Sequence, residues 1–207
     1  MITKEELLRW QTDEEFQLEQ IKQYGHSIKY IHNPSEAVCL ETLKNNGSCI
    51  RYITKPLEEM CLEATKEDGH AIQYIHNPSE KVCLEAVKTN SLSIQCIFNP
   101  SENVCLEAVK QNGYTIQYIH NPSERIQLEA VRQDGNAIQY INNPSERIQL
   151  EAVKKDGRVI KYIHNPSEKL CLEALHNCEK NDLDDVIRCI DIEKYPDLYE
   201  KYCFMKV

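Results

Sequence analysis

The sequence contains no long apolar run and no excess of positive charge. No stretch approaches the roughly 20 apolar residues that a transmembrane helix requires, so we expect no membrane span. Glu5 and Glu6 are acidic where a secretion signal would be basic and then apolar. The 24 Lys and Arg are outnumbered by 33 Asp and Glu, and this argues against direct nucleic-acid binding, which needs clustered basic side chains. These features predict a cytoplasmic protein.

Recognisable catalytic motifs are absent as well. The chain has no evident nucleophile–base pair, glycine-rich phosphate loop or cluster of metal ligands. We therefore expect no enzyme activity, no catalytic residues, no cofactor and no metal. The expected ligand is a protein partner, and the sequence leaves the oligomeric state open.

Proline and glycine, which most often interrupt regular structure, follow one 22-residue period. Seven of the eight prolines obey it: Pro34, Pro56, Pro78, Pro100, Pro122, Pro144 and Pro166. All six glycines obey it too, with Ser91 in the one missing position: Gly25, Gly47, Gly69, Gly113, Gly135 and Gly157. A fixed period of this length is typical of a repeat protein whose units stack on one another.

The first part of each repeat carries helix start and stop signals. In the copy at 121–135, Asn121 is the expected N-cap, Pro122 the first helical residue and Glu124 the partner in a capping box. Gly135 is expected to end the helix in the left-handed conformation. The pattern predicts a helix of about 12 residues in each repeat.

The second part of each repeat, residues 114–120 in one copy, is shorter. Ile116 and Ile119 are spaced for a short helix, and a strand is the alternative because Ile and Tyr favour strands. We favour a helix, either α or 3-10, since the next Asn-Pro leaves room for two turns. The prediction is an all-α protein, an αα-solenoid of about eight 22-residue two-helix repeats with divergent terminal caps.

The expected divisions of the chain follow from where the period holds. They are an N-terminal capping helix at 1–15, a helical repeat array at 16–176 and an acidic helical cap at 177–207. Leu7, Leu8 and Trp10 are expected to face the first repeat. Capping is the expected role of the acidic segment, and an interaction tail is the alternative.

Stacking turns each repeat position into a row. We expect the core to hold three unbroken rows, Leu18 to Leu172, Ile28 to Ile160 and Ile31 to Ile163, with alanines from Ala64 to Ala174 allowing close helix approach. Rows of cysteine (39, 61, 83, 105, 171), histidine (32, 76, 120, 164) and glutamate (19 to 173) look like chemical sites.

Stacking distance argues against chemistry in these polar rows. Helices pack about 8–10 Å apart, too far for a disulfide between neighbouring cysteines or a metal shared by histidines two repeats apart. We interpret the cysteines as packing residues in a reducing compartment, the histidines as local to their linkers and the glutamates as a solvated ion-pair face. The alternatives are a ligand-facing histidine row and a carboxylate stripe for a basic partner.

Positions that vary between repeats are the candidates for partner binding. The residue after the glycine and the residue before Asn-Pro both vary, and both flank the shorter helix, which we expect to line the concave surface. The candidate residues are His70, Leu92, Phe98, Tyr114, His120, Asn136, Arg158 and His164.

The repeat unit is similar to a known family. It reads Leu-Glu-Ala-Val-Lys-x-Asn/Asp-Gly and then Ile-Gln-Tyr-Ile-x-Asn-Pro-Ser-Glu, best at 106–113, 128–135 and 150–157. Over about residues 16–175 the chain resembles a family of short helical repeats of unknown function found in large DNA viruses, phages and some bacteria. The resemblance implies helical repeats and a viral or phage origin, with the host cytoplasm as the compartment, and it carries no catalytic residues.

Two copies depart from the family pattern. The copy at 51–60 has Lys55-Pro56-Leu57-Glu58 in place of Asn-Pro-Ser-Glu, and the copy at 89–98 lacks the glycine and the tyrosine. Both departures predict local irregularity.

Together these observations predict a non-enzymatic scaffold that binds a protein along the concave surface of a solenoid. The alternative is an acidic inhibitor or nucleic-acid mimic that blocks a host defence enzyme, which would need Asp and Glu in excess on one face. Lys and Arg interleave with Glu at 125–154, and this favours the scaffold.

Overall fold

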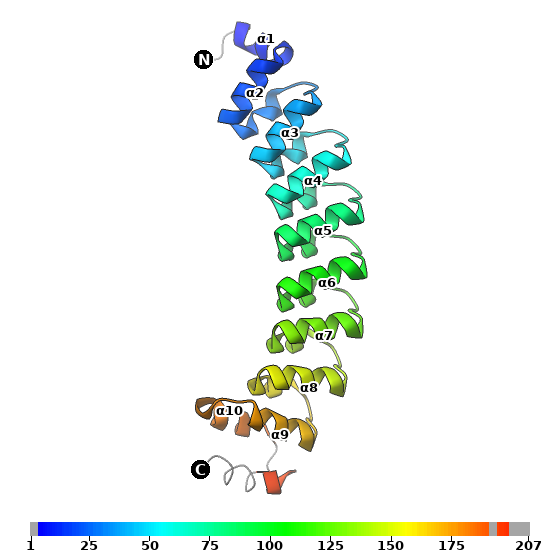
Figure 1. The fold of residues 1–207 in the computed structure, drawn as a ribbon, viewed down its shortest axis with the longest axis vertical. Coiled ribbons are helices and arrows are strands. Elements are labelled where there is room, and N and C mark those ends of the chain that lie inside the picture. Colours follow the sequence, from blue (N-terminus) through cyan, green and yellow to red (C-terminus); the bar gives the residue numbers. More distant parts are fainter. Residues whose placement is uncertain (1–3, 191–193, 199–207) are drawn as a thin grey trace. The chain divides into compact units, whose positions relative to one another are not determined.

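A computed structural model describes residues 4–190 and 194–198, and the chain divides into two compact units, residues 1–108 and 109–207. The described residues form helices and no strand, and one helix pair recurs through each unit (Figure 1). This confirms the all-α helical-repeat solenoid. The strand alternative for the second part of the repeat is wrong, because that segment is a six-residue 3-10 helix.

The first unit contains α1 to α5 with η1 to η4 and most of α6. Their bounds are α1 Lys4–Thr12, α2 Glu14–Gln23, η1 Gly25–Tyr30, α3 Glu36–Asn45, η2 Gly47–Tyr52, α4 Glu58–Glu67, η3 Gly69–Tyr74, α5 Glu80–Thr89, η4 Ser91–Cys96 and α6 Glu102–Gln111. Within this unit α2 to α5 contact one another in sequence order, and η1 to η4 do the same. The unit therefore has an α-helical layer and a 3-10 layer.

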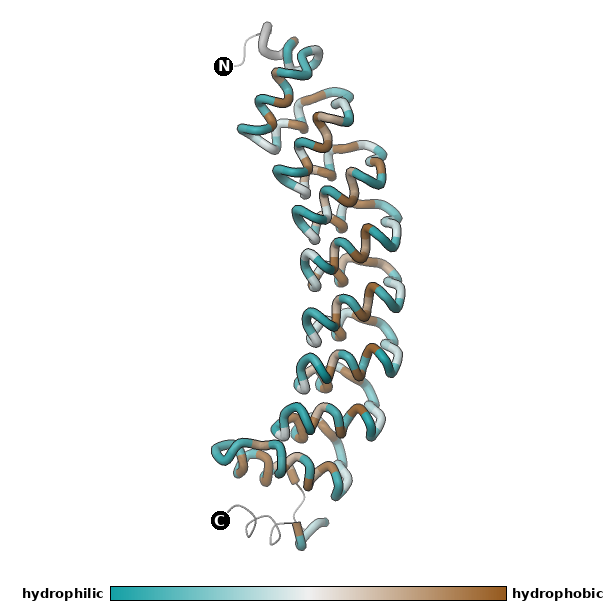
Figure 2. The backbone as a smooth tube through the Cα atoms, viewed as in Figure 1, coloured by the Kyte–Doolittle hydropathy of each residue, from teal (hydrophilic) through white to brown (hydrophobic). Residues whose placement is uncertain are grey.

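The second unit repeats this two-layer arrangement. Its elements are η5 Gly113–Tyr118, α7 Glu124–Gln133, η6 Gly135–Tyr140, α8 Glu146–Lys155, η7 Gly157–Tyr162, α9 Glu168–His176, η8 Lys180–Asp182 and α10 Leu183–Arg188. Five-residue linkers join each six-residue 3-10 helix to the next α-helix, whereas η8 leads directly into α10. In Figure 2 the apolar residues, in brown, recur in every repeat of each unit.

The α-helices begin two residues later than the sequence pattern predicts. Ser123, not Asn121, is the N-cap, since its hydroxyl accepts a hydrogen bond from the backbone N–H of Ile126. The helix starts at Glu124 and has 10 residues rather than about 12. Both side chains can cap a helix, and the backbone conformation of Asn121 decides between them.

The asparagine of each Asn-Pro adopts the left-handed backbone conformation within the linker, three residues after the 3-10 helix has ended, and turns the chain toward the next α-helix. Positive φ angles of 48° to 56° occur at Asn33, Lys55, Asn77, Asn99, Asn121, Asn143 and Asn165. Asparagine tolerates this region better than other residues with a side chain. Lys55 adopts the same conformation without that advantage, and the helices of both divergent copies have the usual lengths, so the predicted local irregularity is wrong for the backbone.

Except at Gly25, the periodic glycine is required by packing rather than by a left-handed turn. No glycine has a positive φ, so the predicted left-handed helix end at Gly135 is wrong. A Cβ at Gly135 would lie 2.8 Å from the carbonyl oxygen of Ala152 in the next repeat. The glycine therefore lets the start of one 3-10 helix touch the last turn of the next α-helix.

The core of each repeat combines both helix types. Ile94 and its equivalents in the 3-10 layer are at most 2% exposed, as predicted. On α5 the buried face is Val82, Cys83, Ala86 and Val87. The leucine row lies beside this face and is mostly half-buried, and Leu172 is 41% exposed, so the prediction of a fully buried leucine row is wrong.

The ends of the chain differ from the repeats. Trp10 packs against the first core cluster, Ile21, Ile31 and Val38, whereas Leu8 is exposed, contrary to its predicted inward position. The side chain of Leu7 lies outside the described residues.

At the other end of the chain, α10 buries Val186, and the Tyr195 hydroxyl donates to the carbonyl of Pro166. Residues 191–193 and 199–207 of the predicted acidic cap lie outside the described residues. No helix within the described ranges combines the length and apolar character needed to cross a bilayer.

Candidate binding surface

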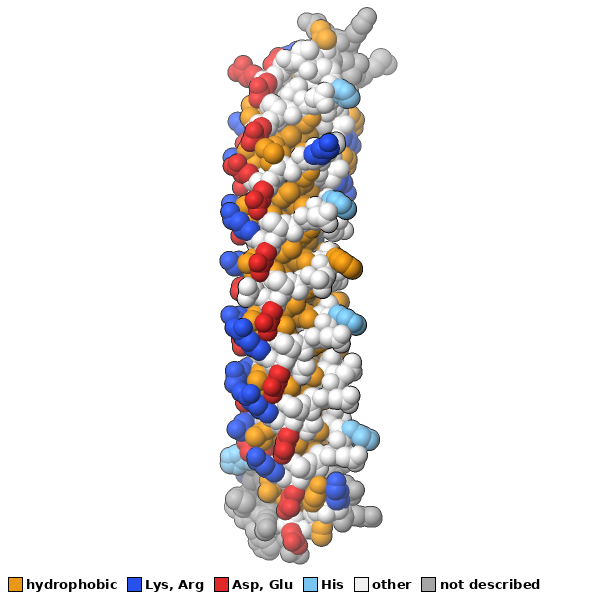
Figure 3. Space-filling view, turned by 90° about the vertical axis from the view of Figure 1, so that its right-hand side faces the viewer, with side chains coloured by type: hydrophobic (Ala, Val, Ile, Leu, Met, Phe, Trp, Pro, Cys, Tyr) orange, Lys and Arg blue, Asp and Glu red, His pale blue; other side chains and the backbone are white. Residues whose placement is uncertain are grey.

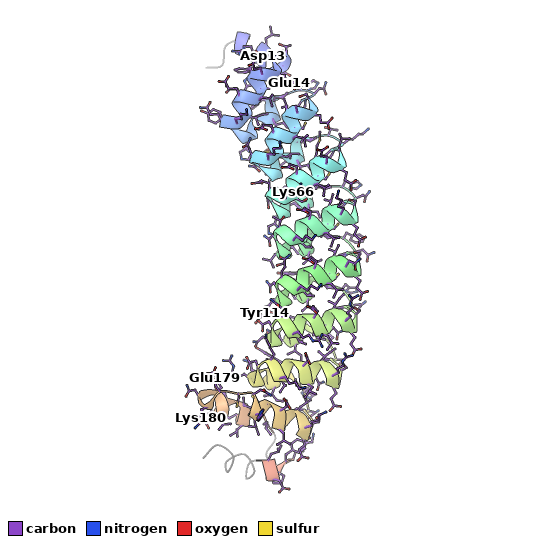
Figure 4. All side chains as sticks on the ribbon, in the orientation of Figure 1. Asp13, Glu14, Lys66, Tyr114, Glu179 and Lys180 are labelled. Carbon is purple, nitrogen blue, oxygen red and sulfur yellow. The ribbon has the colours of Figure 1, made fainter. Side chains whose placement is uncertain are left out.

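The two ends of the 3-10 helices form two separate edges of each unit. The residue after the glycine lies at the corner edge, where an α-helix turns into a 3-10 helix, and the residue before Asn-Pro lies at the linker edge. Six residues of 3-10 helix, at about 2.0 Å per residue, place these edges about 12 Å apart. In Figure 4 the labelled Tyr114 lies on the side of its unit opposite the linkers.

This geometry separates the predicted binding residues into two groups. Those at the corner edge are His70, Leu92, Tyr114, Asn136 and Arg158, and those at the linker edge are Phe98, His120 and His164. The predicted residues therefore lie along two edges rather than one.

Polar residues of the corner edge are already engaged in contacts within the protein. His70 Nε2 lies 3.2 Å from Asn90 Nδ2 of the next repeat. Asn136 donates from Nδ2 to Asp134 Oδ1 at 3.2 Å. The guanidinium of Arg158 donates to both carboxylate oxygens of Asp156 at 2.9–3.2 Å. Here the variable side chains either contact the next repeat, as His70 does, or hydrogen-bond the aspartate that caps their own 3-10 helix, as Asn136 and Arg158 do.

Charge and aromatic contacts reinforce this conclusion. Burial would raise the pKa of Asp156, but hydrogen bonds from Arg158 outweigh it and lower the pKa below its ordinary 3.8. Arg158 also reaches Asp182 of η8 at 3.6 Å. The Tyr114 ring packs edge-on against Tyr140 with centroids 5.8 Å apart, and burial raises the pKa of Tyr114.

The linker edge is open to solvent. Phe98 is 99% exposed, and the next most exposed large apolar side chain among the described residues is Leu8, at 63%. His76, His120 and His164 occupy the same repeat position and are exposed. Within the described ranges, no three His, Cys, Asp or Glu side chains gather closely enough to hold a metal ion.

Apolar grooves lie between successive linkers of the first unit. Figure 3 faces this edge and shows bands of apolar surface, in orange, between paler ridges. The groove between linkers 75–79 and 97–101, which we call the linker groove, has a volume of about 580 Å³. Its walls include Ile75, Ile97 and Val104, and Phe98 stands on one rim. A neighbouring groove of about 620 Å³ lies between linkers 53–57 and 75–79.

One carboxylate is held at the linker groove. Glu80 Oε1 accepts hydrogen bonds from Ser101 Oγ at 2.7 Å and Asn103 Nδ2 at 3.3 Å. Glu80 Oε2 has no partner within the described part of the chain, and neither Lys nor Arg lines this groove. The groove thus combines an apolar floor, an exposed aromatic ring and a single negative charge.

Of the residues that line the linker groove, sequence variation identified only Phe98. Glu80, Ile75 and Val104 recur in every repeat with little change, so variation gave no signal for them. The Asn-Pro-Ser-Glu motif was the available signal, because it marks where each linker and the first helical carboxylate lie.

A charged hollow on the second unit has a different character. It measures about 380 Å³ and is lined by Glu124, Arg125, Leu128, Glu129, Arg132 and Arg147. Arg132 pairs with Glu151 at 2.9 Å and Arg147 approaches Glu124 at 3.9 Å. These charges largely compensate one another, as expected for a solvated helix face.

The cysteine row serves packing. Cys39, Cys61, Cys83, Cys105 and Cys171 are buried free thiols, and burial raises the pKa of each. The Cys105 thiol points at the carbonyl of Pro100, five residues earlier, at 3.9 Å. Gln127 and Gln149 donate to the equivalent Pro122 and Pro144 carbonyls at 2.8 and 2.9 Å. Cysteine and glutamine can therefore both occupy this repeat position.

Comparison with known proteins gives one family. A family described as a domain of unknown function, DUF4116, matches residues 101–144, the length of two 22-residue periods. No curated protein and no solved structure matches the chain. Residues 101–144 are thus similar to an uncharacterised family.

Proposed function

We propose that this protein is a non-enzymatic scaffold that binds a protein partner along the linker edge of its repeats. The observation that supports this most is Phe98, 99% exposed beside an apolar groove. Burying one phenylalanine contributes about 1.5–3 kcal/mol, so a partner that covers Phe98 would gain about that much binding free energy. Stacked-repeat proteins bind partners along a surface of regular repeats, and Phe98 is an exposed aromatic residue that departs from the repeat pattern on such a surface.

The test is capture of partners from cells that naturally make the protein. Wild-type protein is compared with Phe98→His, which installs the residue that neighbouring linkers carry, and with a corner-edge control, Tyr114→Ser with Arg158→Ala. We expect Phe98→His to lose the partner and the corner-edge control to keep it. If the triple replacement of Phe98, Tyr114 and Arg158 still captures the same partner, the proposal is wrong.

An acidic inhibitor that imitates nucleic acid is the second candidate. The first unit favours it to some extent, with 17 Asp and Glu against 10 Lys and Arg, a net charge of −7. Ion pairs such as Lys66–Glu63 interrupt the acidic face, and therefore we rank it second. This candidate would be supported if the captured partner were an enzyme that acts on nucleic acid and if DNA displaced that enzyme from the protein. We also propose a viral or phage origin and the host cytoplasm as the compartment, on the repeat resemblance alone.

A further inference from the structure

We infer that the linker groove binds an extended peptide segment of the partner in which an aliphatic side chain is followed closely by an arginine. This inference rests on the proposed scaffold function and specifies the chemistry of its partner. It joins three features of one groove: the apolar floor, the Phe98 rim and the Glu80 carboxylate.

The width of the groove selects an extended chain. Its two ridges are successive linkers, spaced by one repeat, which is about 8–10 Å for packed helices. An α-helix with its side chains is about 10–12 Å across and would rest on the ridges without entering. An extended segment fits between them and directs alternate side chains to the floor.

The apolar lining selects the aliphatic side chain. Ile75, Ile97 and Val104 are buried to at least nine-tenths, so they form a firm floor, and Phe98 offers a ring that can close over a side chain lying there. Cys83 is also part of the wall, and burial raises its pKa, so it presents a neutral thiol that adds to the apolar lining.

The charge of the groove selects the arginine. Glu80 is its only Asp or Glu, and no Lys or Arg lines it. Hydrogen bonds from Ser101 and Asn103 hold Oε1 of Glu80, so the carboxylate is already ordered. Its Oε2 is left to pair with a ligand. A guanidinium pairs well with a preorganised carboxylate. The net charge of −7 on the first unit would also steer a basic segment toward it.

The experiment uses the full chain and two synthetic probes, fluorescein-labelled nonapeptides that share an isoleucine and differ only by arginine or glutamine two residues later. Fluorescence anisotropy measures their affinity for wild type, Phe98→His and Glu80→Gln. The glutamine variant keeps an acceptor for the Ser101 hydroxyl, and thermal unfolding verifies that both variants fold.

We expect wild type to prefer the arginine peptide by about fivefold to tenfold, which corresponds to about 1–1.4 kcal/mol for a hydrogen-bonded charge pair. Glu80→Gln should abolish that preference, whereas Phe98→His should weaken both peptides about equally and keep the preference. Raising the salt concentration should weaken only the arginine peptide.

Three results would overturn the inference. The first is equal affinity of the wild-type protein for the two peptides, and the second is no binding of either peptide. The third is a dimer at micromolar concentration that Phe98→His dissociates, because a second copy of the chain would then occupy the groove. If peptides fail while Phe98→His still abolishes partner capture, the ligand class is wrong and the scaffold function stands. If capture is also unaffected, both are wrong.

Discussion

Ser79 Oγ donates a 2.6 Å hydrogen bond to Oε1 of Glu58, the first residue of the α-helix in the preceding repeat. The same hydroxyl accepts from the backbone N–H of Val82 and so caps its own helix. Ser101 and Glu80 form the same pair at 2.7 Å. Ser35 with Glu14 and Ser145 with Glu124 pair in the same way, at 2.6 and 3.4 Å. In these repeats the serine and glutamate of the Asn-Pro-Ser-Glu motifs thus link neighbours, a role different from the capping box that the motif suggests.

Removing this link should destabilise the protein. Ser79→Ala deletes a helix cap and an inter-repeat hydrogen bond, and it should lower the free energy of unfolding by about 1–2 kcal/mol. The matched variant is Leu57→Ser, at the N-cap of α4, which has no side-chain hydrogen bond, and it should raise stability by about 0.5–1 kcal/mol. Urea denaturation measures both. Equal effects of the two variants would argue against the link.

A comparison of Gly69 with Gly25 distinguishes a glycine that packing requires from one that packing does not require. A Cβ at Gly69 would lie 2.5 Å from the Ala86 carbonyl oxygen, whereas at Gly25 the nearest atom is 3.7 Å away. Gly69→Ala should therefore destabilise by about 1–3 kcal/mol, and Gly25→Ala should be neutral or stabilise by up to about 1 kcal/mol. Thermal unfolding of the two variants makes the comparison, and destabilisation by both to the same extent would point to backbone conformation instead.

Ser93 carries a buried hydroxyl that has no hydrogen-bond partner among the residues that the structure describes. The equivalent Thr115 hydroxyl donates to the Asn112 carbonyl at 2.8 Å, and the equivalent Ala71 has no hydroxyl. Because a buried unpaired polar group costs about 1–3 kcal/mol, Ser93→Ala should increase stability by about 1 kcal/mol, and Thr115→Val should not. A stability gain of the same size in both variants would contradict this assignment.

The buried thiols should be protected from alkylation, and their contribution to stability should be lost at high pH. At pH 8, with Cys203 replaced by serine, a maleimide should label the exposed Cys189 first, and Cys83 and Cys171 only on unfolding. Burial raises the pKa of Cys171 to about 11 from an ordinary 9.0. Its neutral thiol therefore stabilises the fold fully below about pH 9, and this contribution is lost as the pH rises through about 11. Mass spectrometry locates the label, and early labelling of Cys171 would contradict the packing role.

The repeat period and both helical segments could be predicted from the sequence, because Pro and Gly mark local events. The exact start of each α-helix could not, since asparagine and serine are both good caps and only the left-handed backbone at Asn121 assigns the role to Ser123. The packing role of the glycines could not be predicted either, because it depends on a carbonyl 17 residues away, such as that of Ala86 for Gly69.

The candidate surface was predicted in part. Sequence variation identified Phe98 and the exposed linker histidines, but it could not show that Arg158 and His70 are paired within the protein. It also could not show the groove, whose walls come from residues of two repeats that are constant in sequence. Variable residues mark an edge, and only packing shows which edge leaves its side chains available.

The most direct test of the account is photo-crosslinking in cells that naturally make the protein. Benzoylphenylalanine replaces Phe98 at the linker edge or, in a separate variant, Tyr114 at the corner edge. The account predicts that the probe at position 98 crosslinks a protein partner and that the probe at position 114 does not. Crosslinking from position 114 alone would contradict it.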